Sequence, residues 1–111
     1  MTTRLFAVFA TDRPGRSAVR AATRESHRAY LRQAHPEGTL VVLGGPTLDE
    51  ATAMNGTLLV VRASCVDEVR RFLAADPYAI GDLFETVDIR EWRCGLVRAD
   101  ILAAEVPAAP K

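Results

Sequence analysis

The order of helix-like and strand-like segments along the chain is the feature that most constrains its fold. Short apolar or alternating runs are typical of strands, and apolar residues spaced three and four apart are typical of helices. The expected elements are a strand over Arg4–Thr11, a helix over Arg16–Ala34, strands over Thr39–Leu43 and Thr57–Val61, a helix between Ser64 and Asp76-Pro77, and a strand over Leu83–Arg93. This β-α-β-β-α-β order predicts an α+β, ferredoxin-like protein with both helices on one face of an antiparallel sheet.

Turn and capping residues set the expected boundaries of these elements. Gly44–Pro46 follows an apolar run and predicts the end of the second strand, while Asn55–Gly56 is a dipeptide typical of tight turns. We therefore expect the second and third strands to pair as a hairpin with a long connection. At the second helix, the spacing of Ser64 and Asp67 predicts a serine cap on the first backbone amides.

The chain has the length of one domain followed by a short extension. Its 111 residues, 49% hydrophobic and 25% charged, match a single globular domain. We assign residues 1–93 to this domain and residues 94–111 to a C-terminal extension, with a short helix over Arg98–Val106 and a partly mobile, Pro- and Ala-rich end. Because both helices would cover the same sheet face, the other face would be open and apolar, which predicts a homodimer.

Charge and motif content argue against several classes of function. The formal net charge is zero, so the positive field of a nucleic-acid-binding protein is missing, and no apolar run approaches the roughly 20 residues of a membrane helix. We expect no nucleic-acid partner, no membrane partner and a cytoplasmic location. The chain has no phosphate-binding glycine loop, no metal-spaced cluster of His or Cys and no nucleophile elbow, so we expect no cofactor and no metal.

His27 is the residue whose position best suits chemistry. Its neighbours on the same helix face include Thr23, Tyr30 and Leu31, which place it on or beside the sheet-facing stripe. A partly buried imidazole needs a partner, and Asp76, at the end of the second helix, is a candidate that would fix the tautomer and favour the protonated form. The alternative is a core histidine and an aspartate that only caps the loop at Pro77.

Four further side chains could line a pocket around this pair. Tyr30, Tyr78, Arg90 and Trp92 would supply hydroxyl donors, a cation and an apolar wall for a small organic acid, although each of them could equally be structural. Arginines recur every four residues from Arg16 to Arg32, which predicts a solvated strip winding around the first helix and could attract an anionic substrate. His35 lies in a turn, where we expect it on the surface.

Several motifs resemble those of the YciI-like, or YCII-related, protein family. They are the segment DPYAIGDLFETVDIREW over Asp76–Trp92, the helix segment HRAYL over His27–Leu31, the D-R-P-G after the first strand and the GGP after the second. The resemblance spans Arg4–Arg93 and implies a dimeric α+β barrel in which the family's paired His and Asp, its proposed catalytic dyad, fall on His27 and Asp76. The chain departs from the usual motif at Asp82, where a glycine is more common.

The resemblance favours an enzyme, and a binding protein stays as the alternative. In the first case Asp76 orients His27, which acts as a general acid or base on a small organic substrate, as in a lyase, dehydrochlorinase or isomerase. In the second case the chain is a non-catalytic ligand-binding or accessory protein that keeps the same fold and uses the pair as pocket structure. Loss of turnover in a His27 variant would distinguish the two classes.

Overall fold

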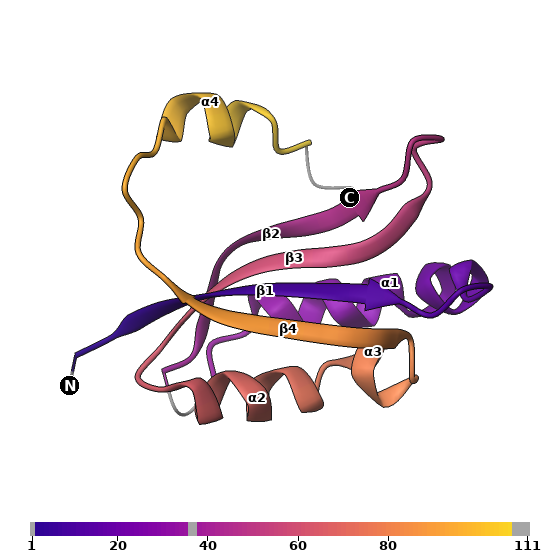
Figure 1. The fold of residues 1–111 in the computed structure, drawn as a ribbon, viewed down its shortest axis with the longest axis horizontal. Coiled ribbons are helices and arrows are strands. Elements are labelled where there is room, and N and C mark those ends of the chain that lie inside the picture. Colours follow the sequence, from indigo (N-terminus) through magenta and orange to yellow (C-terminus); the bar gives the residue numbers. More distant parts are fainter. Residues whose placement is uncertain (1, 36–37, 108–111) are drawn as a thin grey trace.

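A computed structural model, which describes residues 2–35 and 38–107, forms a four-stranded antiparallel sheet in the order β2-β3-β1-β4 (Figure 1). The elements are β1 (Arg4–Asp12), α1 (Ser17–Arg32), β2 (Leu40–Leu48), β3 (Met54–Ala63), α2 (Val66–Ala74), α3 (Pro77–Ile80), β4 (Phe84–Trp92) and α4 (Ala99–Ala104). This order and pairing confirm the α+β, ferredoxin-like prediction. The short helix α3, directly after α2, was not predicted.

The hydrophobic core lies between one face of the sheet and the helices α1 and α2. Alternate residues of the two central strands point into it, including Phe6 and Val8 of β1 and Val61 of β3. The apolar stripe of α2 packs against them, with Val69 and Phe72 buried. A strand places successive side chains on opposite faces, so only every second residue of these two apolar runs enters the core.

The opposite face of the sheet, which we call the open face, carries an apolar patch together with the charged side chains of Arg62, Asp88 and Arg90. Its strand registers place Phe9 beside Leu58, and Phe9 is 49% exposed. The same face carries Leu5, Ala7, Leu40, Leu43, Val60 and Trp92. In Figure 1 the helices α2 and α3 lie on one side of the sheet, and α4 stands apart on the other.

Two turn predictions for the β2–β3 hairpin were wrong. The strand β2 continues through Gly44–Pro46, and Asn55–Gly56 lies within β3. Because β2 is an edge strand, Pro46 can occupy it without a missing hydrogen bond inside the sheet, and register shifts flank this segment on both sides. The connection is instead closed by Asp49, whose carboxylate accepts hydrogen bonds from two backbone amides of residues 51–53.

The start of α2 also differs from the prediction. Cys65 occupies the N-cap position, and no side-chain capping bond forms there. Ser64 is paired with Glu68 instead of capping the helix: its amide and its hydroxyl donate to the two carboxylate oxygens at 2.9 and 2.7 Å. The negative charge of Glu68 therefore sits in the first turn of α2, where the helix dipole favours it.

The C-terminal extension forms α4 within the predicted helical segment. Every residue from 94 to 107 is exposed. The predicted mobility of the Pro- and Ala-rich end falls mainly on residues 108–111, which lie outside the described residues. Across the part of the chain that the structure describes, none of the helices has the length and apolar character to cross a membrane.

Candidate functional site

His27 and Asp76 are in direct contact between α1 and the start of α3. The Nδ1 atom of His27 lies 2.8 and 2.9 Å from the two carboxylate oxygens of Asp76. Both residues are buried, with exposures of 6% and 1%. The helical spacing that turns His27 inward and the extended backbone before Pro77 together bring the two side chains face to face.

Asp76 is held in place by a second interaction. Its side chain accepts a hydrogen bond of 2.9 Å from the backbone amide of Tyr78, which makes Asp76 the N-cap of α3, and Pro77 occupies the first helical position. An ionised carboxylate can only accept hydrogen bonds, so His27 donates through Nδ1–H. The Nε2 atom has no protein partner within the described residues, and in the neutral ring it carries the lone pair that can accept a proton.

The other side of His27 is covered by a stack of charged and aromatic groups. The ring of Tyr78 lies against the imidazole, with centroids 3.8 Å apart and planes 18° apart. The guanidinium of Arg20 lies over the far face of Tyr78, at 4.7 Å from the ring centroid. The imidazole plane is therefore fixed both by the carboxylate at its edge and by the phenol on its face.

Arg20 is anchored by a buried ion pair. Its guanidinium donates to both oxygens of Asp12 at 2.7 and 2.9 Å and to the hydroxyl of Thr57 at 2.8 Å. Burial lowers the pKa of Arg20, but the hydrogen bonds and the charge of Asp12 outweigh burial and raise the pKa above its ordinary value. Burial likewise raises the pKa of the Tyr78 phenol, against the opposing charges of Arg20 and Arg24. At neutral pH the stack thus contains a cation and a neutral phenol.

The arginine strip of α1 was wrongly predicted to lie entirely in solvent. Arg20 is only 3% exposed, whereas the small residues Ala22 and Ser26 of the same helix are exposed. Arg20 lies seven residues before His27 and so shares its helix face. This spacing indicates a buried position, but the charge of an arginine favours the opposite prediction. Arg24, three residues before His27, is half-buried and has no carboxylate partner within the described residues.

The remaining predicted residues on α1 and its exit loop serve the junction with α2. Tyr30 donates its hydroxyl to the carbonyl of Phe72 at 2.6 Å and stacks on that ring. Burial and the charge of Asp76 raise its pKa, so Tyr30 is near the pair, with its hydroxyl already engaged. His35 is half-buried against Tyr30 and Phe72, which corrects the prediction of a surface position.

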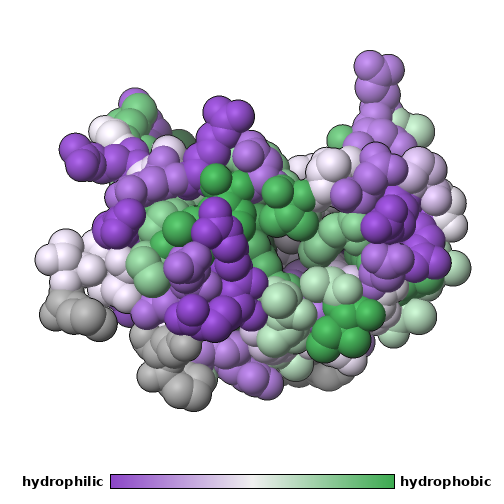
Figure 2. Space-filling model, turned by 60° about the horizontal axis from the view of Figure 1, so that its bottom comes forward, coloured by the Kyte–Doolittle hydropathy of each residue, from purple (hydrophilic) through white to green (hydrophobic). Residues whose placement is uncertain are grey.

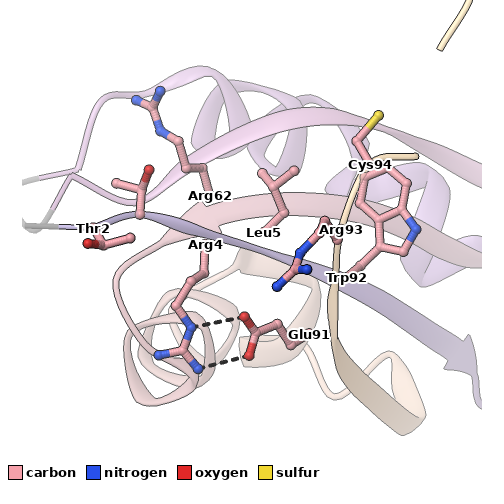
Figure 3. Close-up of a pocket in the computed structure, with 9 residues that line it drawn as sticks. Thr2, Arg4, Leu5, Arg62, Glu91, Trp92, Arg93 and Cys94 are labelled. Carbon is pink, nitrogen blue, oxygen red and sulfur yellow. Dashed lines mark hydrogen bonds and ion pairs between the residues drawn. The ribbon is translucent and has the colours of Figure 1, made fainter. Parts of the chain in front are cut away.

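Arg90 and Trp92 do not lie with the His27–Asp76 pair. Both project from β4 on the open face, opposite the helices, and Arg90 is ion-paired with Asp88. Trp92 borders a separate cavity of about 460 Å³ around the start of β1 and the end of β4 (Figure 3). The other residues that line this cavity are Thr2, Thr3, Arg4, Leu5, Arg62, Glu91, Arg93 and Cys94. The alternation of β4 was visible in the sequence, but which of its faces meets the helices was not.

Asp82, the departure from the family motif, points away from the pair. Its backbone has a φ of 56°, in the left-handed region that glycine adopts most easily and that aspartate tolerates better than most residues. The side chain is exposed and pairs with Arg13 at 3.3 Å. A glycine at this position would serve the backbone turn, and the carboxylate of Asp82 does not enter the site.

The side of the molecule that carries the pair is not uniformly polar. Figure 2 brings forward the side on which α2 and α3 lie, and apolar surface borders a hollow near the middle of this face, among strongly hydrophilic side chains. Within the described residues, no group of three or more His, Cys, Asp or Glu side chains could hold a metal ion. An imidazole whose Nδ1 is held by a carboxylate and whose Nε2 has no partner within the described residues is suited to proton transfer at Nε2.

The sheet order and the helix layer define the subunit fold of the ferredoxin-like, dimeric α+β barrel class. More narrowly, the family model of the YCII-related domain matches residues 4–93, and the chain belongs to this family. The proteins called YciI from Escherichia coli O6:H1 and Shigella flexneri are each 24% identical over 94 residues, which span 80% of this chain and 96% of theirs. The matched segment ends where the C-terminal extension begins.

Two solved structures extend the comparison. The 5-chloro-2-hydroxyhydroquinone dehydrochlorinase from Burkholderia phenoliruptrix, solved in complex with 2,5-dihydroxybenzoquinone, is 32% identical with a TM-score of 0.71, covering 82% of this chain and 95% of its own. SnoaB, a cofactor-independent oxygenase from Streptomyces nogalater, is 14% identical with a TM-score of 0.50, covering 88% and 98%. The first likeness extends to sequence, and the second is one of fold alone.

Proposed function

We propose that this protein is a cofactor-free enzyme that uses the His27–Asp76 pair for general acid–base chemistry on a small organic substrate. The observation that carries the proposal is the geometry of His27: a carboxylate holds Nδ1, an aromatic ring covers one face, and Nε2 has no partner within the described residues. The proposal is further supported by the 32% identity to a dehydrochlorinase crystallised with a dihydroxyquinone.

The reaction type that fits is an elimination such as loss of hydrogen chloride. The Nε2 lone pair of His27 takes a proton from the substrate, the electrons of the broken bond form a new double bond, and chloride leaves with the electrons of the carbon–chlorine bond. Asp76 stabilises the imidazolium that forms, and its two contacts keep the ring oriented through the step. The proton then passes to solvent, so no redox partner is required.

We propose that Arg24 binds the negatively charged group of the substrate. It lies on the same helix face as His27, and its charge acts on the Tyr78 ring that stacks on His27. With no carboxylate partner within the described residues, its guanidinium can attract an ionised hydroxyl or carboxylate of the substrate. This refines the sequence-based expectation of an anionic small molecule, which was drawn from the whole arginine strip.

Turnover of chlorinated hydroxyquinones, followed by chloride release, tests the enzyme proposal. Replacing His27 with Asn should lower kcat by about 10²–10⁴-fold, the usual contribution of a general acid or base. His35→Asn is the matched control, because His35 packs against Tyr30 and Phe72 and should leave kcat unchanged. A His27→Asn variant as active as the wild type would refute acid–base chemistry at this site.

The role of Arg24 is tested separately. Arg24→Gln should raise KM for an ionised substrate with a smaller effect on kcat, whereas Arg28→Gln, one turn further along α1, should change neither. If no compound of a panel of chlorinated hydroxyquinones, lactones and muconates is turned over but some bind with His27-dependent affinity, the chain is the ligand-binding protein of the alternative. Equal KM values for both arginine variants would exclude Arg24 as the residue that binds the charged group of the substrate.

The assembly that we propose for this enzyme is a homodimer formed through the open face. The exposed side chain of Phe9 and the aliphatic residues beside it form an apolar patch of the kind that marks a protein–protein interface. The cytoplasmic location expected from the sequence stays a prediction.

A further inference from the structure

The residues that follow the YCII-related domain form an arm in which no described residue is buried against its own subunit. We define the arm as residues 94–107, all of which are exposed. It carries five large apolar side chains, and Ile101, in the middle of α4, is 62% exposed. The five are Leu96, Val97, Ile101, Leu102 and Val106. Figure 1 shows the arm leaving the end of β4 and carrying α4 to the side of the sheet opposite α2.

The helix in this arm is too short to be stable without a packing partner. α4 has 6 residues and no side-chain capping bond. Isolated helices shorter than roughly 12–15 residues are marginal in water, and most helical stability in proteins comes from packing of an apolar face. Since no residue of α4 is buried against its own subunit, the missing packing has to come from elsewhere.

The exposed area of the single chain supports the same conclusion. The chain exposes 7592 Å², whereas a compact monomer of 12.1 kDa would expose about 6,000 Å². If two chains hid this surplus from each other, they would bury about 3,000 Å² together, which is within the range of permanent homodimers. Weak, transient contacts bury less than about 1,200 Å² in total, so a surplus of this size is typical of a stable interface.

We infer that the arm docks on a second copy of this chain, so that two arms are exchanged in a symmetric dimer. The open face supplies the apolar surface that the dimer needs, and the arm begins two residues after Trp92, which lies on that face. The arm is thus continuous with the face through which the dimer forms. Exchange gives each α4 the apolar neighbours that it lacks and covers surface on both subunits at once.

This inference rests on the homodimer proposed above and is independent of the chemistry at His27. The arm lies beyond residue 93, where the family match ends, so it is an addition to the shared domain. Docking of the arm would therefore lower the Kd of a dimer whose main interface is the open face. Loss of the arm should weaken association and leave the fold of residues 4–93 intact.

Sedimentation equilibrium over a range of concentrations tests the arm energetically. The double variant Ile101→Ser/Leu102→Ser should raise the dimer Kd by at least about 100-fold, because two large apolar side chains of each arm are removed from the interface. Asp100→Ser, a polar change in the same helix, should leave Kd within about threefold. A wild type that is monomeric would overturn the homodimer and the arm together, whereas an unchanged Kd in the double variant would overturn the arm alone.

Isotope-filtered NMR decides which subunit the arm contacts. Dimers are formed from one chain labelled at the isoleucine δ1 methyl groups and one unlabelled chain, and Ile101 is one of only three isoleucines. We expect intermolecular NOEs from the Ile101 methyl to protons of the unlabelled chain. If Ile101 shows NOEs only within its own chain, the arm folds back on its own subunit and the exchange is refuted.

Discussion

Removing the carboxylate of Asp12 is the substitution whose cost the structure specifies most directly. Asp12 holds Arg20 by two hydrogen bonds of 2.7 and 2.9 Å, and the two side chains are only 9% and 4% exposed. The variant Asp12→Ala leaves the Arg20 charge buried without a carboxylate, with the Thr57 hydroxyl and the Tyr78 ring as its remaining partners. Breaking one side of a buried ion pair costs about 3–5 kcal/mol, so we expect the free energy of unfolding to fall by that amount.

Urea unfolding at a fixed protein concentration measures this loss. With a slope of about 1.5 kcal/mol per molar urea, the midpoint should fall by about 2–3 M. Asp67→Ala is the matched control, because Asp67 pairs with Arg70 at 2.9 Å on the exposed side of α2 and should cost less than about 1 kcal/mol. The double variant Asp12→Ala/Arg20→Met, which leaves no buried charge, should recover at least half of the loss.

A loss below about 1 kcal/mol in Asp12→Ala would refute the reasoning, since it would mean that the Arg20 charge reaches solvent. Failure of Arg20→Met to rescue the single variant would also contradict it, because the cost would then not arise from an unpaired cation. The rescued double variant is also informative for the site. It removes the guanidinium from the face of Tyr78, so any change in turnover at constant stability reports on the stack beside His27.

Three further predictions concern the backbone and one carboxylate. Gly56→Ala should cost about 1–3 kcal/mol or more, because a Cβ at this position would overlap the carbonyl oxygen of Ala10, and a melting temperature equal to wild type would contradict this. Asp82→Gly should leave the free energy of unfolding unchanged or raise it by up to about 1 kcal/mol, because glycine adopts a φ of 56° without strain. Asp82→Val should lower the free energy of unfolding by about 1–2 kcal/mol. Equal stabilities of the Gly and Val variants would exclude backbone strain at this position. Hydrogen bonds from Ser64 lower the pKa of Glu68 below its ordinary 4.5. Glu68 therefore stabilises the fold above that value, and this contribution is lost as pH falls through the folded pKa. Thermal melts should show Glu68→Gln less stable than wild type at neutral pH, with the difference vanishing in acid.

Periodicity was sufficient to predict the fold because each element repeats its signal several times. The apolar run around Phe6 and the stripe around Phe72 identify a strand and a helix without knowledge of their neighbours. Boundaries depend on single residues, and there local signals competed. Asn55–Gly56 is typical of a turn, but Asp49 closes the connection earlier, and the close approach of β1 requires glycine at position 56 within β3.

The site was predictable only in part, for a related reason. Spacing on α1 turned His27 inward, and chain order made Asp76 a plausible neighbour. Arg20 shares the same helix face, but an arginine is expected in solvent unless its partner is known, and Asp12 is brought to it only by folding. Arg90 and Trp92 were wrongly expected beside the pair, because a strand pattern defines two faces without saying which one the helices cover.

The irregular edge strand β2 has a consequence for how copies of this chain meet. An exposed edge with regularly spaced backbone donors invites another strand to add to the sheet, which leads to fibrous or unlimited aggregates. In β2, Pro46 removes one donor and two register shifts disturb the spacing of the others. Open-ended growth along this edge of the sheet is thereby disfavoured, which favours the proposed association through the open face, where growth would stop at two copies.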